Sequence, residues 1–187
     1  KKVIEVKRKL RPVVSELGEK DSAALFEFYR DREFIYIGYE NECCLVELDE
    51  EPPHEINKEA LDIALTMAKT LDMFIPDKIQ VMRKLVLDGS TTTSFQRTML
   101  ISYGPAKFED INLISLYLEE DAAVPKKIEN GKIYYSLSRL GIPLIELGTD
   151  ASIKSPEHAK QIAGDIGLFF RTFNVKRGIG TIRQDVN

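Results

Sequence analysis

The sequence is poor in cysteine and histidine and contains no long hydrophobic run. Its two cysteines, Cys43 and Cys44, are adjacent, so they form neither a CxxC motif nor a disulfide framework, and we expect buried thiols in a reducing compartment. His54 lies in a proline-rich loop and His158 at the start of a predicted helix, so no metal cluster can be built from the two histidines. No stretch approaches the roughly 20 apolar residues of a membrane-spanning helix, and no signal peptide is recognisable. We therefore expect a cytoplasmic protein with no membrane partner.

Several catalytic signatures are absent as well. The sequence has no GxxxxGK[ST] phosphate loop, no GxSxG, no Ser-His-Asp set and no dinucleotide-binding fingerprint. What remains is a set of acids, arginines and a glycine-containing basic loop, distributed over predicted strands. This inventory suits metal-dependent phosphoryl transfer, in which the protein mostly positions groups and neutralises charge.

The composition is that of an ordinary folded chain. Of 187 residues, 43% are hydrophobic and 30% charged, which suits one soluble domain or slightly more. The formal net charge is -4, so the chain as a whole is not a basic surface for nucleic acid, although a local patch could bind it. The chain begins on Lys1 rather than on methionine and ends within an apparent strand, so we expect residues 1–187 to be a single domain cut from a longer protein.

The hydrophobic pattern predicts an α+β fold with a mostly antiparallel sheet and flanking helices, because strands come in hairpin-like groups between helices. Helices are expected after the cap residues Asp21 or Ser22, Asn57 and Ser155. Irregular chain is expected after Pro12 and an exposed turn around Pro125. Strands are expected over 33–40, 43–50, 78–88, 95–104, 111–120, 133–141, 142–148 and 181–187.

Three consecutive acids, Glu119, Glu120 and Asp121, end the apolar strand predicted over 111–120. In a regular strand Glu119 and Glu120 point to opposite faces, but a bulge or the strand end could bring both to one ligand. Closely spaced carboxylates raise each other's pKa and reduce stability. A divalent cation removes that cost, and oxygen ligands favour Mg²⁺. The alternative is a charged turn in solvent.

Other polar residues occur in predicted strands and turns. Glu146 lies in a strongly apolar strand, and Arg139, which precedes a Gly-Ile-Pro turn, could pair with Glu146 or bind phosphate. In the last predicted strand Arg183 and Asp185 share one polar face. Each of these could equally be a structural ion pair or a solvated face. The hydroxyl-rich loop 88–94, which leads into Gln96 and Arg97, could line a phosphate or polar ligand site.

Five ordered motifs together resemble the GatB/GatE family of tRNA-dependent amidotransferases over nearly the whole chain, and several details resemble its archaeal GatE branch. The motifs are "MRKLVLDGSTTTSFQRT" (82–98), "LEEDAA" (118–123), "SRLGIPLIEL" (138–147), "IKSPEHA" (153–159) and "GTIRQDVN" (180–187). The resemblance implies a cradle-shaped catalytic domain similar to the glutamine synthetase and guanido kinase folds. It also implies a kinase subunit that uses ATP and Mg²⁺ to phosphorylate the γ-carboxylate of Glu-tRNA(Gln). Ammonia from a partner subunit, the asparaginase-like GatD in archaea, would then give Gln-tRNA(Gln).

The resemblance also implies roles for individual residues. The acidic pair Glu119 and Glu120 and the last-strand Asp185 match expected Mg²⁺ ligands, and Glu146 matches a strand acid of the catalytic site. Lys84 matches a lysine that faces substrate or the ammonia path. Residues in matching motifs that would contact nucleotide phosphates or support the site are Arg139, Arg183, Gln96 and Arg97.

Two departures and two rival functions remain at this point. The family's Glu-x-His metal ligands are expected before Lys1, and its tRNA-binding domains after Asn187, so the metal site of this excerpt is expected to be incomplete. One rival is a glutamine-synthetase-like ligase that acts on a free carboxylate. The other is a non-catalytic RNA-binding or assembly module, which the retention of all four acids disfavours.

Overall fold

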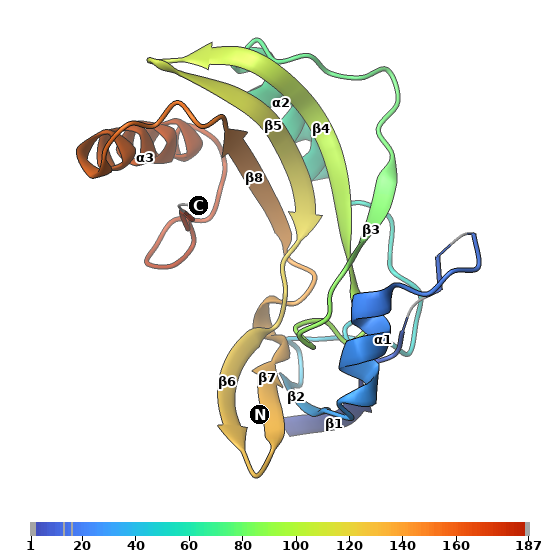
Figure 1. Cartoon of the computed structure of the whole chain (residues 1–187). Helices are drawn as coiled ribbons and strands as arrows, with labels where there is room; N and C mark the ends of the chain where they lie inside the picture. The colour runs from blue at the N-terminus through green and yellow to red at the C-terminus, as the bar shows by residue number, and fades with distance from the viewer. Residues whose placement is uncertain (1–2, 13, 16, 186–187) are drawn as a thin grey trace. The chain divides into compact units, whose positions relative to one another are not determined.

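The computed structural model describes residues 3–12, 14–15 and 17–185, and in these the chain is α+β, as the sequence predicts (Figure 1). No helix in this part of the chain is long and apolar enough to cross a membrane. In chain order the elements are β1 Val3–Lys9, α1 Ser22–Tyr29, β2 Glu33–Tyr39, α2 Lys58–Thr70, β3 Val81–Leu85, β4 Phe95–Phe108, β5 Ile111–Glu120, β6 Val124–Glu129, β7 Lys132–Ser136, the 3-10 helix η1 Leu137–Arg139, β8 Pro143–Thr149 and α3 Pro156–Arg171.

The strands form two four-stranded sheets rather than the single sheet expected. Their orders are β1-β2-β7-β6 and β3-β4-β5-β8. In the first sheet β2 pairs antiparallel with β1 and parallel with β7, while β6 and β7 form an antiparallel hairpin. In the second sheet β3 pairs antiparallel with β4, with Lys84 opposite Gln96. The mostly antiparallel pairing that the sequence predicts is therefore confirmed, with β2 and β7 as the parallel exception.

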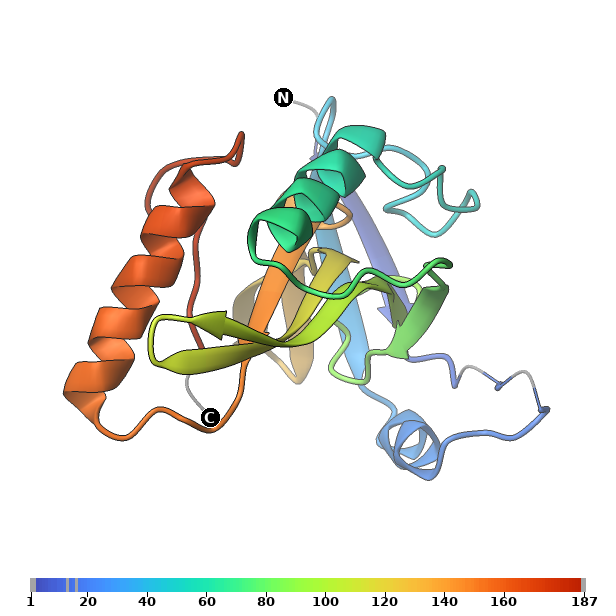
Figure 2. The ribbon, with the colours of Figure 1, turned by 90° about the horizontal axis from the view of Figure 1, so that it is seen from above.

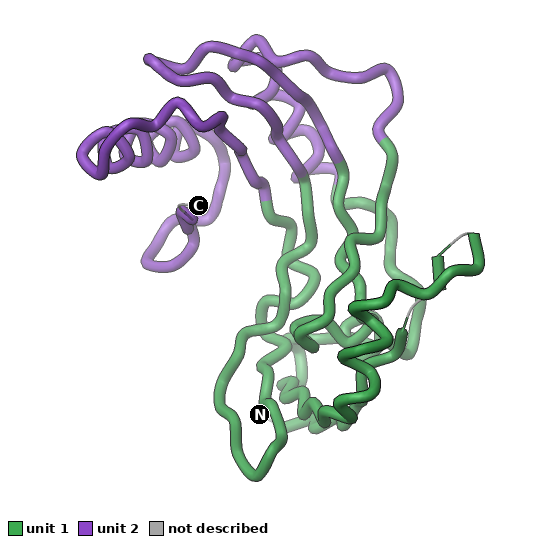
Figure 3. Tube along the Cα trace, in the orientation of Figure 1, with its two compact units in different colours: residues 1–57, 80–99, 118–144 green, residues 58–79, 100–117, 145–187 purple. Residues whose placement is uncertain are grey.

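The chain divides into two compact units, which are described separately (Figure 3). Unit 1 comprises residues 1–57, 80–99 and 118–144, and unit 2 comprises residues 58–79, 100–117 and 145–187.

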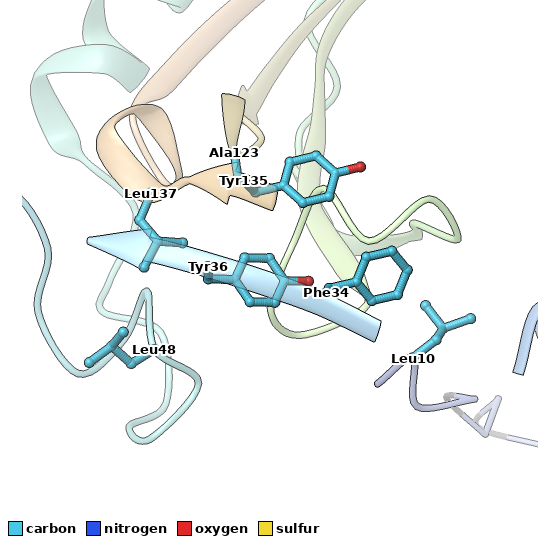
Figure 4. Close-up of a cluster of buried hydrophobic side chains, with 7 residues drawn as sticks. All are labelled: Leu10, Phe34, Tyr36, Leu48, Ala123, Tyr135 and Leu137. Carbon is cyan, nitrogen blue, oxygen red and sulfur yellow. The ribbon is translucent and has the colours of Figure 1, made fainter. Parts of the chain in front are cut away.

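The core of unit 1 holds the hydroxyl-rich loop 88–94 in place (Figure 4). Tyr36 donates its hydroxyl to the carbonyls of Gly89 (2.6 Å) and Thr91 (3.1 Å), and Tyr135 donates to the carbonyl of Asp88 (2.8 Å). Burial raises the pKa of Tyr135 to about 12 and raises that of Tyr36 as well, so both hydroxyls remain donors. The buried cluster beneath the loop consists of Leu10, Phe34, Tyr36, Leu48, Ala123, Tyr135 and Leu137.

Unit 2 contains α2, α3, the β4–β5 hairpin end of the second sheet and most of β8. The helix α3 starts as predicted, because Ser155 accepts the backbone N–H of His158 (3.1 Å) and Pro156 occupies the first turn. After α3 the chain turns back alongside the helix, where the Gln184 amide donates to the carbonyl of Ala163 (Figure 2). This segment is irregular over 181–185, so the strand predicted from residue 181 is wrong in the described residues, and its last positions, 186 and 187, lie outside them.

Three local predictions in unit 1 also fail, for identifiable reasons. Residues 43–50 form turns instead of a strand, because the Glu47 carboxylate accepts the Cys44 N–H (2.6 Å) and Asp49 adopts a positive φ of 58°. Residues 124–129 form β6, where a register shift accommodates Pro125. The strand predicted through residue 141 ends at Ser136, whose hydroxyl caps η1.

Asp150, in unit 2, carries a pH dependence that can be measured. Hydrogen bonds from Ser152 and Asn112 lower the pKa of its carboxyl to about 2. Because the folded pKa lies below the usual 3.8, the stability that Asp150 contributes is complete above about pH 4 and is lost as the pH falls toward 2. Urea unfolding of wild type and Asp150→Asn should therefore show a stability difference at pH 6 that shrinks toward pH 2. A difference that is constant across this range would contradict the assignment.

Candidate active site

Glu119 is the most buried acid at the end of β5, with 4% of its side chain exposed. Its Oε1 accepts the hydroxyl of Thr98 (3.1 Å) and lies 3.4 Å from Lys84 Nζ, while its Oε2 accepts from Gln96 Nε2 (3.4 Å). A buried carboxylate is tolerated only with such partners, since desolvation otherwise penalises its charge. Lys84 is half exposed, so the charge pair is buried at one end and open to solvent at the other.

Glu120 forms a separate pair with Arg97. Its Oε1 accepts from Arg97 Nε (2.9 Å) and also from Nη2, and Arg97 Nη1 donates to the carbonyl of His54 (2.7 Å). The partners follow the strand alternation, because Glu119 uses Gln96 and Thr98 of β4 whereas Glu120 uses the residue between them. The sequence predicts that the side chains of Glu119 and Glu120 point to opposite faces of the strand, and their side-chain partners differ accordingly.

Asp121 connects the end of β5 to the turn that precedes β8. Its backbone N–H donates to the carbonyl of Ile142 (2.7 Å), and its carbonyl accepts from Gly141 (3.0 Å). Its side chain lies 3.6 Å from Arg139 Nε, a buried atom with no hydrogen-bond partner in the described residues. The described acid beside Arg139 is therefore Asp121, where the sequence suggested Glu146 or a phosphate.

A small cavity of about 50 Å³ adjoins this cluster within unit 1. Polar residues in its lining include Glu47, Glu51, Thr91, Gln96, Glu120 and Asp121. A larger open depression of about 420 Å³ on unit 2 is lined by none of the predicted site residues.

The structure brings together six predicted site residues within unit 1: Lys84, Gln96, Arg97, Glu119, Glu120 and Arg139. The other three belong to unit 2, where Glu146 is exposed on β8 and Arg183 and Asp185 are exposed in irregular chain. Sequence reasoning missed Thr98, although a residue two positions after Gln96 in a strand shares its face. It also missed Glu47 and Glu51, whose approach to the cavity depends on turns between distant strands.

Some of the carboxylates at the end of β5 are suited to bind a metal cation, and others are not. Glu120 and Asp121 line the cavity and provide carboxylate oxygens, the ligands that Mg²⁺ prefers. Glu119 already accepts hydrogen bonds at both oxygens. Within residues 3–12, 14–15 and 17–185, no group of three or more His, Cys, Asp or Glu side chains is placed to hold a metal ion.

Comparisons with known proteins point to one family. The GatB/GatE catalytic domain matches residues 30–187. The GatE subunit of glutamyl-tRNA(Gln) amidotransferase from Saccharolobus solfataricus is 54% identical over 186 residues, which cover 97% of this chain and 29% of that protein. The same subunit from Archaeoglobus fulgidus is 53% identical over 186 residues (96% and 30%), and that from Methanococcus maripaludis is 50% identical over 189 residues (98% and 30%). The chain thus spans about 30% of the length of these relatives.

Proposed function

The chain belongs to the GatB/GatE catalytic domain family, and we propose that it is the kinase part of an ATP-dependent amidotransferase that acts on Glu-tRNA(Gln). Its domain would have the cradle architecture expected from the sequence. The complete protein would work in the cytoplasm with an ammonia-producing partner of the asparaginase-like GatD type, and further domains would hold the tRNA.

The observation that carries this proposal is the cluster at the end of β5. Buried Glu119 with Lys84, and Glu120 with Arg97, lie side by side in segments that the family match covers. Such alternating carboxylates and cations can hold a highly charged phosphoryl group and its counterion without a covalent intermediate on the protein.

In the proposed reaction a γ-carboxylate oxygen of the glutamyl group bonds to the γ-phosphorus of ATP, and ADP leaves. Ammonia then attacks the acyl phosphate and releases phosphate, giving the amide. Lys84 would neutralise charge at the reacting carboxylate, Arg97 would hold Glu120 in place, and Arg139 and Arg183 would contact nucleotide phosphates. Gln96, which bonds both Glu119 and the backbone of Glu120, would fix their relative positions.

Mg²⁺ would be held by Glu120 with Glu119 and Asp185, completed by ligands outside this chain, and Glu146 would serve as a further acid of the site. The bound Mg²⁺ would neutralise the charge that develops on the transferring phosphoryl group. Glu119 could coordinate this Mg²⁺ only by releasing one of the hydrogen bonds that its carboxylate now accepts.

The test uses the full-length protein with its partner, ATP and Mg²⁺. Glu-tRNA(Gln) should stimulate ATP turnover, whereas free glutamate at the same or much higher concentration should not. Stimulation by free glutamate would favour the glutamine-synthetase-like ligase instead. Binding of tRNA without any ATP turnover would favour a non-catalytic RNA-binding module.

A further inference from the structure

A buried hydroxyl on β4 supports the pair of Glu119 and Lys84 from below. Thr98 is 6% exposed, and its Oγ1 donates to Oε1 of Glu119, a carboxylate that is itself almost fully buried (3.1 Å). The same Oε1 lies 3.4 Å from the ammonium nitrogen of Lys84, whose side chain is half exposed. Thr98, Glu119 and Lys84 therefore form a chain of contacts that runs from a buried strand position to the surface of unit 1.

The register of β3 and β4 explains why these groups meet. Lys84 lies opposite Gln96, and Met82 lies opposite Thr98, so strand alternation puts Lys84 and Thr98 on the same face of the two strands. Thr98 has a short side chain on a regular, buried strand position, and its hydroxyl has little freedom to move. Lys84 has a flexible four-carbon stem, so the place of its ammonium group depends on the carboxylate that it pairs with.

The two oxygens of Glu119 are held unequally. Oε1 faces both the Thr98 hydroxyl and the Lys84 ammonium group, whereas Oε2 accepts a longer hydrogen bond from Gln96 (3.4 Å), whose amide also donates to the carbonyl of Glu120. Hydrogen bonds to an ionised group are stronger than those between neutral groups, so the Thr98 hydroxyl restrains rotation of the Glu119 carboxylate. The two roles proposed for Glu119 would then use different oxygens, because Oε1 would hold Lys84 while Oε2 turns to Mg²⁺.

We infer that Thr98 is a positioning residue, which acts through Glu119 to hold the Lys84 ammonium group where it would neutralise the reacting carboxylate, an inference that rests on the proposed function. Thr98 is buried beneath Glu119 and does not itself contact the substrate. The rate of a phosphoryl transfer depends on the alignment of such charges. Loss of the hydroxyl should therefore slow the chemical step and leave substrate affinity unchanged.

The primary experiment compares Thr98→Val, which keeps the shape but removes the hydroxyl, with Thr98→Ser, which keeps the hydroxyl but removes a methyl group. The full-length protein is assayed with its partner, ATP, Mg²⁺ and Glu-tRNA(Gln). Thr98→Val should lower kcat by about tenfold or more, the effect of one hydrogen bond to a charged group, with KM within about twofold of wild type. Thr98→Ser should keep kcat within about threefold of wild type, because the hydrogen bond is retained. The matched control is Ser102→Ala, which removes a fully buried hydroxyl from the same strand, 3.6 Å from the sulfur of Met73, and should change neither constant.

A double variant tests whether the effect passes through Lys84. Lys84→Met alone is expected to lower kcat by about 100-fold, the usual cost of a group that stabilises transition-state charge. Addition of Thr98→Val to Lys84→Met should lower kcat by less than about twofold further, because the group that Thr98 positions is already missing. Two independent effects would instead multiply.

A second readout needs no turnover. The Lys84 amine must leave the Glu119 carboxylate before it can react with acetic anhydride, and mass spectrometry of the protein without substrates gives the acetylation rate at this residue. Thr98→Val should raise that rate by about threefold or more, as expected for the loss of one hydrogen bond. Thr98→Ser and Ser102→Ala should leave it unchanged. The exposed Lys126 on β6 is the internal reference, and its rate should be the same in all variants.

Four results would overturn the inference. These are a wild-type kcat in Thr98→Val, a loss of kcat in Thr98→Ser as large as that in Thr98→Val, multiplied effects in the double variant, and an unchanged or slower acetylation of Lys84 in Thr98→Val. Melting curves are recorded for every variant, and losses of kcat that follow the melting temperature rather than the hydroxyl would give Thr98 a structural role alone. If Glu-tRNA(Gln) fails to stimulate ATP turnover in wild type while the acetylation rates follow the hydroxyl, the proposed function fails but the hold of Thr98 on Lys84 stands.

Discussion

Glu119→Gln and Glu120→Gln are each expected to slow phosphoryl transfer to Glu-tRNA(Gln) by about 100-fold or more, the usual cost of removing a group that stabilises transition-state charge. In Glu119→Gln the buried end of the Lys84 pair loses its negative charge. In Glu120→Gln the Arg97 guanidinium loses its ion pair, and the cavity loses one carboxylate. The measurement is transfer of labelled γ-phosphate and formation of Gln-tRNA(Gln) by the full-length protein with its partner. Both variants should keep their affinity for tRNA.

The control for charge alone is Glu129→Gln. Glu129 is a half-exposed acid on β6 that pairs with Lys127 at the surface, and its neutralisation should leave turnover unchanged. Asp185→Asn belongs to the same series, because we propose this exposed residue as a metal ligand. The expected loss of turnover is about 100-fold. If turnover in the Glu119 and Glu120 variants falls by less than about threefold, far less than this, the acids at the end of β5 have only a structural role.

The part of the site that could be predicted is the part carried by regular strands. Glu119, Glu120, Gln96 and Arg97 sit at strand positions where alternation alone fixes which side chains can meet, and the observed pairs obey it. The cavity could not be predicted, because Glu47 reaches it through a turn stabilised by its own carboxylate. Reading 43–50 as a strand placed that acid on the wrong kind of element.

The fold shows the same division between local and non-local information. The helices α1 and α3 begin where Asp21 and Ser155 cap them, a signal contained within four residues. The parallel pairing of β2 with β7 joins segments about 100 residues apart, and no local pattern encodes it. In the strand β1, exposed and partly buried positions alternate. Because this strand is rich in lysine and arginine, the alternation is not visible as a hydrophobic pattern in the sequence.

Gly89→Ala is expected to destabilise unit 1 by about 2–5 kcal/mol, the sum of a left-handed backbone in a non-glycine residue and an overpacked core. Gly89 has a φ of +81°. A Cβ there would lie 2.7 Å from Phe34 Cζ and nearer still to two other carbons of that buried ring. Phe34 belongs to the core cluster and is 2% exposed, so it has little room to move. Chemical denaturation of wild type and variant gives the difference directly.

Gly131→Ala isolates the backbone contribution. Gly131 has a φ of +75° in the β6-β7 turn, but nothing lies within 4 Å of an added Cβ. It should therefore cost only about 1–2 kcal/mol. Equal losses in the two variants would show that the Phe34 contact contributes nothing.

The functional consequence of Gly89→Ala follows from what the loop carries. Tyr36 binds the carbonyls of both Gly89 and Thr91, so a shift of the loop away from Phe34 must strain one of these two hydrogen bonds. Thr91 would then move relative to Glu47 and Asp121, which line the same cavity from other segments. Because the alignment of reacting groups depends on such distances, Gly89→Ala should slow phosphoryl transfer to Glu-tRNA(Gln) at temperatures where the protein is still folded, whereas Gly131→Ala should leave the rate unchanged. Loss of stability with an unchanged rate of phosphoryl transfer would show that the loop position is set by contacts other than those with the Tyr36 hydroxyl.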